Sequence, residues 1–244
     1  MKPVKIFAVA SALCLIAACG GGGGSGPTPT PTTPAEQAAS VAAIEVGQQA
    51  AGEGALDGFS QFLPDMDAMA LKAKIAGQTK ATETKNINLS DQPCTRDDPE
   101  SGTYSVTGTL TGSCSIALPS ISCTATNSSM SITFNGCRKT IEIGGTQYEI
   151  AIDGPATAAI TGTIIGTLEG DEFTPTSTDF NGTLAGTVDV SGDAEGTVDL
   201  TGVSFAGTGA GVPEITCSGT CTISLTGQEE AVCEVTTECD GCAE

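Results

Sequence analysis

The chain has 244 residues, with 9 Lys and Arg against 29 Asp and Glu, which gives a formal net charge of -20. So acidic a surface is a poor partner for nucleic acid and for anionic lipid head groups, because both are themselves negatively charged. Histidine is absent, which excludes Ser-His and Cys-His nucleophile pairs and most zinc hydrolase sites.

Residues 1–18 have the pattern of a secretory signal peptide. Two lysines give a positively charged N-terminal region, and an apolar stretch runs from Ile6 to Ile16. Ala17 and Ala18 are small residues of the kind found before a cleavage site. The apolar stretch is shorter than the roughly 20 residues that cross a bilayer as a helix. The sequence therefore predicts export rather than a membrane span.

The four residues Ile16-Ala17-Ala18-Cys19 resemble the lipobox of bacterial lipoproteins. The resemblance covers only the start of the chain. It implies cleavage before Cys19, acylation of that cysteine with palmitate-type chains, and contact with the membrane through this covalent lipid. In such lipoproteins the next residue influences sorting, and Gly20, not being Asp, implies the outer membrane. The periplasmic and the cell-surface face of that membrane stay open as alternatives.

Residues 19–34 are predicted to form a tether. A run of glycines with one serine is followed by alternating proline and threonine from Pro27 to Pro34. The first part is typical of a flexible linker and the second of a stiffer polyproline-like segment. Such a tether would hold a folded body away from a surface.

Residues 35–80 are predicted to form a helical segment with one or two helices. Thr33-Pro34-Ala35-Glu36 has the pattern of a capping box with proline at the first helical position. A modest apolar stripe runs to about Ala51, and glycines then break the pattern; the stripe consists of Ala38, Val41, Ile44 and Val46.

A second helix is predicted from Asp65 or Met66 to Ala76, where Gly77 would end it. Its packing residues would be Met66, Met69, Leu71 and Ile75.

Residues 86–236 are predicted to form an antiparallel β domain. From Gly102 onward the pattern has period two and is rich in Thr, Val and Ile, with frequent glycines. Glycines on an inner face are where long strands bend, so they favour a curled sheet. We therefore expect a mainly β fold, a curled antiparallel meander of about ten strands that forms an open sheet, a sandwich or a partial barrel.

Two hairpins have a predicted register. The turn Gly144-Gly145 would set Ile141 opposite Tyr148, because two glycines accept positive φ at both turn positions. A three-residue loop at residues 193–195 would set two further pairs opposite each other, namely Val190 with Val198 and Val188 with Leu200.

Nine cysteines lie beyond Cys19, and export would place them where disulfides persist. Cys217 and Cys221 flank a three-residue hairpin loop and are predicted to pair. Cys114 and Cys123 flank a turn and are predicted to pair as well, with Ile116 opposite Ile121. The remaining candidates are Cys94 with Cys137, and Cys233, Cys239 and Cys242 in or beside the acidic tail, residues 237–244. Nine is odd, so one thiol is left over.

The spacing of Cys239 and Cys242 also fits a redox pair or half of a zinc site. Surrounding acids would raise a thiol pKa, which opposes redox chemistry. A four-cysteine zinc site with Cys217 and Cys221 is an alternative, although structural disulfides are the favoured interpretation. The acid clusters Asp171 with Glu172 and Asp193 with Glu195 lack the spacing of a calcium loop. No metal or cofactor is expected beyond the lipid on Cys19.

These features favour a non-enzymatic protein of the cell envelope. The first hypothesis is a disulfide-braced β domain with a structural or protein-binding role at the outer membrane. The alternative is a half-barrel that carries a lipophilic ligand in an apolar cavity. A carboxylate-based hydrolase needs no histidine and is the third hypothesis, but the chain is only 4% aromatic and offers few platforms for sugars.

Overall fold

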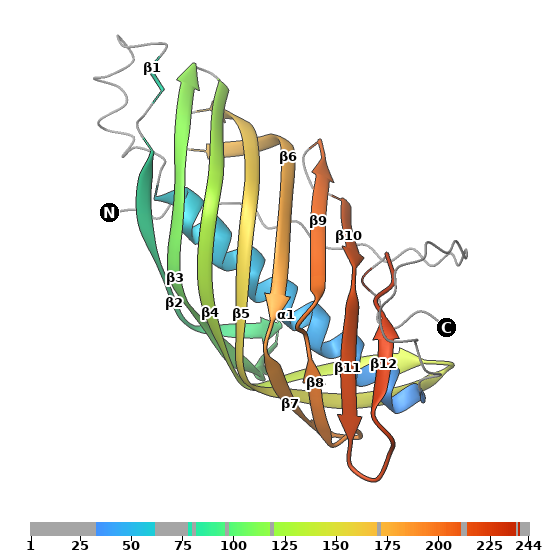
Figure 1. Cartoon of the computed structure of the whole chain (residues 1–244). Helices are drawn as coiled ribbons and strands as arrows, with labels where there is room; N and C mark the ends of the chain where they lie inside the picture. The colour runs from blue at the N-terminus through green and yellow to red at the C-terminus, as the bar shows by residue number, and fades with distance from the viewer. Residues whose placement is uncertain are drawn as a thin grey trace.

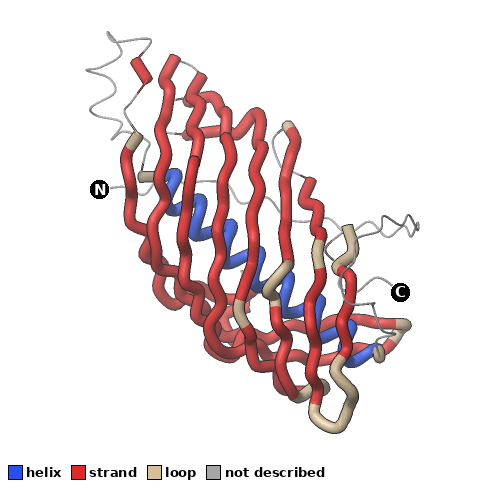
Figure 2. The backbone as a smooth tube through the Cα atoms, in the orientation of Figure 1, coloured by secondary structure: helices blue, strands red, loops and turns tan. Residues whose placement is uncertain are grey.

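The computed structural model describes residues 33–61, 78–79, 82–95, 98–117, 120–169, 172–210, 214–237 and 239. Within them, one helix, α1 (Pro34–Ser60), lies against an antiparallel sheet of twelve strands (Figures 1 and 2). The mainly β prediction is confirmed, and the sheet is open, not closed into a barrel. The signal peptide, Cys19, most of the tether, the predicted helix at 65–76 and Cys242 lie outside the described residues.

The strands follow one another in chain order as a meander. They are β1 (Gln78–Thr79), β2 (Glu83–Thr95), β3 (Asp98–Ala117), β4 (Ser120–Ile143), β5 (Thr146–Glu169), β6 (Glu172–Ala185), β7 (Thr187–Gly192), β8 (Gly196–Asp199), β9 (Val203–Gly209), β10 (Glu214–Ser218), β11 (Thr220–Leu225) and β12 (Ala231–Glu234).

Several short strands continue one another along the same line of the sheet. β5 pairs with β6 through residues 157–169 and with β7 through residues 150–153. In the same way, β8 and β9 lie end to end, as do β10 and β11: β9 pairs with β10, and β8 pairs with β11. The sheet therefore starts at β1 and β2, which both pair with β3, and finishes at β12, which pairs with β11.

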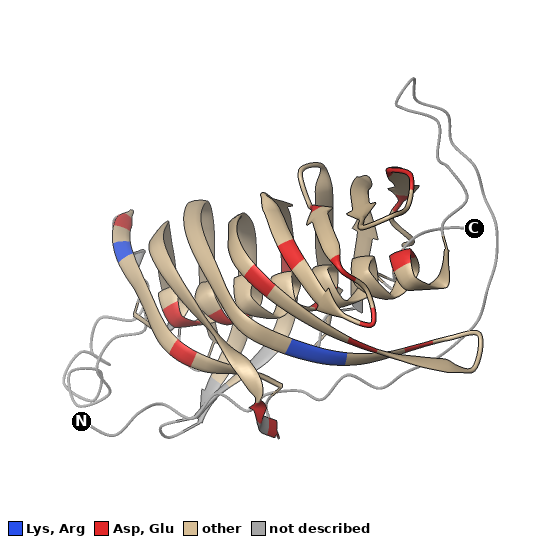
Figure 3. Ribbon diagram, turned by 90° about the horizontal axis from the view of Figure 1, so that it is seen from below, with Lys and Arg blue, Asp and Glu red and all other residues tan. Residues whose placement is uncertain are grey.

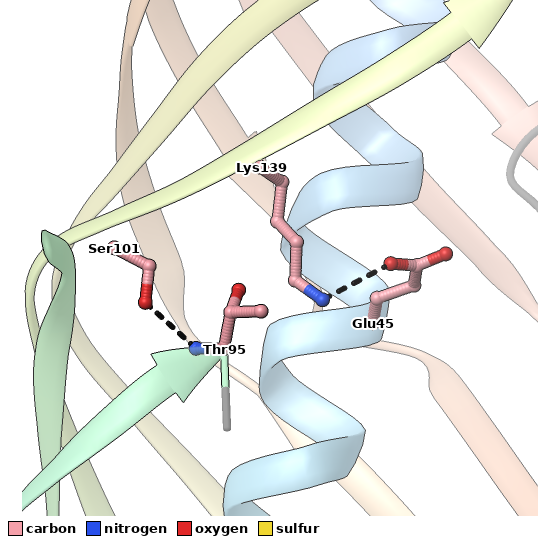
Figure 4. Close-up of polar contacts among 4 residues, drawn as sticks. All are labelled: Glu45, Thr95, Ser101 and Lys139. Carbon is pink, nitrogen blue, oxygen red and sulfur yellow. Dashed lines mark hydrogen bonds and ion pairs between the residues drawn. The ribbon is translucent and has the colours of Figure 1, made fainter. Parts of the chain in front are cut away.

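The long strands β4 and β5 bend near their shared hairpin. Their register breaks between Phe134 and Cys137, and the Gly136 N–H donates to Asp153 Oδ1 at 2.7 Å. Beyond this bulge the hairpin turns away from the rest of the sheet (Figures 1 and 3). There Lys139 Nζ lies 3.5 Å from Glu45 Oε2 of α1, so this arm of the sheet reaches the helix (Figure 4).

The predicted capping box is present at the start of α1. The Thr33 hydroxyl accepts the Glu36 N–H at 3.3 Å, and the Glu36 carboxylate accepts the Thr33 N–H at 2.6 Å. Pro34 occupies the first turn, where a missing N–H costs nothing. These contacts fix where the tether ends and the helix begins.

The predicted end of the helix near Ala51 is wrong, because α1 continues to Ser60. Two of the glycines in this stretch, Gly54 and Gly58, face the sheet at close range. A Cβ on Gly54 would lie 2.9 Å from Val106 Cγ1, and one on Gly58 would lie 2.9 Å from Leu110 Cδ2. Packing against the sheet thus outweighs the helix-weakening effect of glycine, which is about 1 kcal/mol per residue.

The first half of α1 is buried on nearly every side. The predicted stripe is buried, and so are Ala39, Ser40, Ala42 and Ala43 between its members, while Glu45 stays exposed. A helix that is apolar all round is expected to be enclosed. The small alanines let both the main sheet and the β4–β5 arm approach the helix.

The inner face of the sheet supplies the other half of the core. Its fully buried large side chains include Ile87, Tyr104, Val106, Leu110, Met130, Ile132, Ile150, Ile152, Leu184, Val198 and Ile223. Strand residues on the opposite face are mostly Thr and Ser, as the alternating burial along β4 shows. One face is therefore packed on the helix and the other is polar.

One of the two predicted registers is confirmed. Ile141 pairs with Tyr148 across the glycine turn. The other is wrong by two residues, since Val188 pairs with Val198 and Val190 with Gly196. The physical reason is that residues 191–193 bond to β5: the Asp193 N–H donates to the Glu149 carbonyl at 2.9 Å. The loop before β8 is longer as a result.

Candidate functional site

Four buried cysteines gather on the last strands of the sheet. This C-terminal cysteine cluster consists of Cys217 on β10, Cys221 on β11, Cys233 on β12 and Cys239 after β12, each less than 8% exposed. Cysteine sulfurs can form disulfides and exchange them, which makes a group of them a potentially reactive site. We therefore take it as the candidate site.

The first bond of the cluster joins Cys217 to Cys239, so the predicted Cys217–Cys221 disulfide is wrong. Residues 218–220 are not a hairpin loop. Gly219, with φ +108°, lets the chain continue from β10 into β11, and both segments pair with the same neighbouring line, β9 and β8. Cys217 and Cys221 thus lie four residues apart along one strand instead of facing each other.

The chain after β12 returns to β10 and delivers the partner of Cys217. The Val235 N–H donates to the Gly219 carbonyl at 2.9 Å, and the Cys217 N–H donates to the Thr237 carbonyl at 3.0 Å. The Cys239 N–H then donates to the Thr236 carbonyl, which closes a turn. These backbone bonds place Cys239 beside Cys217.

The second contact of the cluster is between Cys221 and Cys233. They are register partners on β11 and β12, and their Sγ atoms lie 2.9 Å apart. Cys221 is a free thiol, whereas Cys233 is disulfide-bonded. Burial, together with the negative charge of Asp199 on β8, raises the pKa of the Cys221 thiol to about 12, although a backbone hydrogen bond to Cys221 acts the other way.

The other two predicted disulfides are present in the main part of the sheet. Cys114–Cys123 joins adjacent strands β3 and β4, and the pair Ile116 and Ile121 lies in register beside it. Cys94–Cys137 joins β2 to β4, with its Cα atoms 5.4 Å apart. Together with Cys217–Cys239, these bonds brace both ends of the curled sheet.

The structure describes only part of the two acid clusters, Asp171 with Glu172 and Asp193 with Glu195. Asp171 lies outside the described residues, and the position of the Glu172 side chain is not described. The Asp193 carboxylate accepts the Glu149 N–H at 2.8 Å, so it has a structural role in the sheet. No group of three or more Cys, Asp or Glu side chains in the described part of the chain could hold a metal ion.

The four thiolates of the zinc hypothesis are not present, because Cys217 and Cys239 are bonded to each other.

Two polar contacts between helix and sheet were not foreseen from the sequence. The Gln48 amide of α1 donates to Cys217 Sγ, and the Tyr104 hydroxyl of β3 donates to the Glu53 carboxylate of α1. In the sequence, Gln48 and Glu53 are simply polar residues of a helix. A polar helix residue gives the same sequence signal whether it faces solvent or a hydrogen-bond partner. Tyr104 is buried, so its hydroxyl needs such an acceptor.

The concave side of the sheet is occupied by α1 itself. Gly47 lies so close to the sheet that a Cβ there would be 2.9 Å from Leu184 Cδ1, and Ile44 and Val46 are fully buried. The helix begins beside the β11–β12 turn, where the Thr33 hydroxyl donates to Gln228 Oε1 at 3.0 Å. The start of α1 is therefore held at this end of the sheet.

Within the described ranges, α1 is not apolar enough to qualify as a transmembrane helix. Comparison with protein-family models, with curated proteins and with solved structures finds no match to this chain.

Proposed function

We propose that the protein is a lipid-anchored component of the outer membrane whose disulfide-braced β domain has a structural or protein-binding role. Acylation of Cys19 would supply the anchor, residues 19–34 the tether, and the sheet with α1 the displayed body. The observation that carries this proposal is the position of α1, which fills the concave face of the sheet.

This packing favours a rigid body over a lipophilic-ligand carrier. A carrier of the half-barrel type needs an apolar space between helix and sheet. Here no such space exists at Gly54 and Gly58, because an added Cβ would already lie 2.9 Å from Val106 Cγ1 and 2.9 Å from Leu110 Cδ2, respectively. A ligand would have to displace the helix, and with it much of the hydrophobic core.

The exposed surface suits contact with a protein more than contact with an anionic membrane. The outer face of the sheet carries rows of Thr and Ser. Acidic residues occur on several strands, and basic residues are few (Figure 3). Threonine pairs such as Thr124 with Thr163, whose hydroxyls lie 3.0 Å apart, order this face. A partner would therefore be polar or basic, because like charges repel acidic lipids and nucleic acid.

Membrane fractionation tests the anchor. The Cys19→Ser variant should leave the membrane fraction and appear as soluble protein, and globomycin should make the precursor of the wild-type chain accumulate. A Cys114→Ser variant is the matched control, because it changes a cysteine of the body and should stay with the membrane. Membrane association of the Cys19→Ser variant equal to wild type would contradict the proposal.

Native mass spectrometry tests the body separately. Protein taken from envelopes and released from its anchor should have the mass of the chain alone. A co-purified lipid of fixed stoichiometry would instead support the carrier hypothesis, whatever the outcome of fractionation.

A further inference from the structure

The outer face of three adjacent strands carries no charge. Residues 101–117 of β3, 120–135 of β4 and 154–168 of β5 contain no Asp, Glu, Lys or Arg, although the chain has 29 acidic and 9 basic residues. An exposed surface ordinarily carries charges of both signs, because they keep it soluble. We call the outward-facing side chains of these three ranges the hydroxyl face, since most of them are Thr or Ser.

The hydroxyl groups of this face repeat in two directions. Along β3 the outward positions Thr107, Thr109 and Thr111 alternate with inward ones, which sets them about 6.8 Å apart on an extended strand. Across the strands, Thr107 is in register with Ser131 and Ser131 with Thr157, and neighbouring strands lie about 4.8 Å apart. The backbone therefore arranges the hydroxyls as a two-dimensional array.

Several contacts hold this array in place. The hydroxyl oxygens of Thr124 on β4 and Thr163 on β5 lie 3.0 Å apart. The buried Cys114–Cys123 disulfide, next to Thr124 in the chain, joins β3 to β4 on the inner side of the sheet. Threonine is β-branched, so its χ1 angle has little freedom. A rigid array of this kind loses little conformational entropy when it binds.

The composition of the hydroxyl face selects a neutral partner with hydrogen-bonding groups. A charged partner would find no opposite charge there. An apolar partner would leave the hydroxyls without hydrogen bonds, which costs free energy. Sugar rings commonly stack on aromatic side chains, but the aromatic residues of these ranges, Tyr104 and Phe134, are buried on the inner side. A surface made of water molecules is neutral and offers donors and acceptors throughout.

We propose that the hydroxyl face binds ice. Spacings of about 4.8 and 6.8 Å are close to repeat distances between oxygen atoms in the ice lattice, so many hydroxyls can contact water molecules of one crystal surface together. Each contact is weak, and the binding strength comes from their number. Among the described elements, α1 packs on the other side of the sheet and none covers this face (Figures 1 and 2). This activity goes beyond the proposed role in the envelope and does not require the lipid anchor.

Incorporation into growing ice tests the proposal. The full chain with Cys19→Ser is used, because this form carries no covalent lipid and needs no detergent. A dilute solution is frozen slowly on a cooled probe, and the protein in the ice is compared with that in the remaining liquid. Slowly growing ice excludes proteins that do not bind it, so this chain should be enriched in the ice fraction. A share in the ice no greater than that of serum albumin would overturn the proposal.

Matched variants assign the binding to the hydroxyl face. Thr107→Tyr and Ser131→Tyr each place a bulky side chain within the array and should abolish the enrichment. Gln147→Tyr makes a similar change at an exposed strand position of the β4–β5 arm and should leave the enrichment at the wild-type level. Tyrosine is favourable in strands, and circular dichroism of each variant shows that the fold is kept. Enrichment of both face variants equal to wild type would overturn the proposal.

Two further measurements distinguish other occupants of the face. Retention on insoluble cellulose without enrichment in ice would assign the face to a neutral polysaccharide. A dimer in analytical ultracentrifugation that Thr107→Tyr dissociates, again without enrichment in ice, would assign it to a second copy of the chain. Either result would overturn ice binding.

Discussion

Individual residues decide how closely the helix and the sheet can approach. Gly58 of α1 faces Leu110, and an added Cβ would lie 2.9 Å from Leu110 Cδ2 and 3.0 Å from Leu110 Cβ. Gly52, only six residues earlier on the same helix, has no atom within 4 Å of such a Cβ. The same amino acid is thus required by packing at one position and unfavourable at another.

This contrast predicts opposite effects of one substitution. Gly58→Ala should lower the free energy of unfolding by about 1–2 kcal/mol, because Leu110 Cβ belongs to a fixed strand and cannot move aside. Gly52→Ala should raise it by up to about 1 kcal/mol through helix propensity. Urea denaturation of both variants measures the difference, and equal changes in stability would contradict the packing described here.

The buried thiol predicts a loss of stability in alkali. The pKa of Cys221 is about 12 in the folded chain against 9.0 for an unperturbed thiol, so the fold favours the protonated form. The protonated thiol therefore contributes to the free energy of unfolding. This contribution is complete below about pH 9 and is lost as pH rises towards 12, by at most about 1.4 kcal/mol per pH unit. Cys221→Ala should show a smaller decrease in stability than wild type above pH 9. Parallel pH profiles of the two proteins would argue against a raised pKa.

Disulfides join strands of the sheet that would otherwise be held together only weakly by their turns. Cys94–Cys137 closes a separation of 43 residues and joins β2 to β4, whereas Cys114–Cys123 closes only 9 residues and joins neighbours. The longer loop restricts the unfolded chain more. Its position next to the β4 bulge also holds the arm that contacts α1.

Removing each bond should therefore have a graded effect. The chain-entropy estimate gives about 4 kcal/mol for Cys94→Ala with Cys137→Ala, and about 2.6 kcal/mol for Cys114→Ala with Cys123→Ala. Thermal melts of the two double variants should show the larger decrease in Tm for the first. The reverse order would show that native packing, rather than loop closure, determines their contribution.

Over the whole molecule, α1 acts as the centre of the core rather than as an attached segment. Ile44 is fully buried, while Leu56 on the same helix is 40% exposed. The helix packs against β2, β3, β4, β5, β8 and β11, so deleting it would uncover the inner face of these strands. The fold therefore depends on helix and sheet together.

Matched truncations on α1 test this dependence. Ile44→Ala should cost about 2–4 kcal/mol, because it leaves a cavity in a packed core. Leu56→Ala should cost less than about 1 kcal/mol, since its side chain keeps much of its contact with water. Urea denaturation followed by circular dichroism gives both values and shows whether strand and helix signals are lost together. Separate transitions would contradict a single core.

The sequence by itself determined the local features of this protein. Period-two alternation, the capping box at Thr33 and the turn at Gly144-Gly145 depend on neighbouring residues, and the antiparallel sheet, the helix start and the Ile141–Tyr148 register follow from them. The pairs Cys114–Cys123 and Cys94–Cys137 were also among the candidates.

Only the tertiary structure decided what depends on contacts distant along the chain. Asp193 bonds to β5 and shifts the register of β7 with β8, and Gly219 continues a strand where a hairpin was expected. The returning chain after β12 then gives Cys217 the partner Cys239 and sets Cys221 against Cys233. Likewise, glycines that weaken an isolated helix are retained in α1 because the sheet packs against them. In each case a contact between distant segments outweighs a local preference of about 1 kcal/mol.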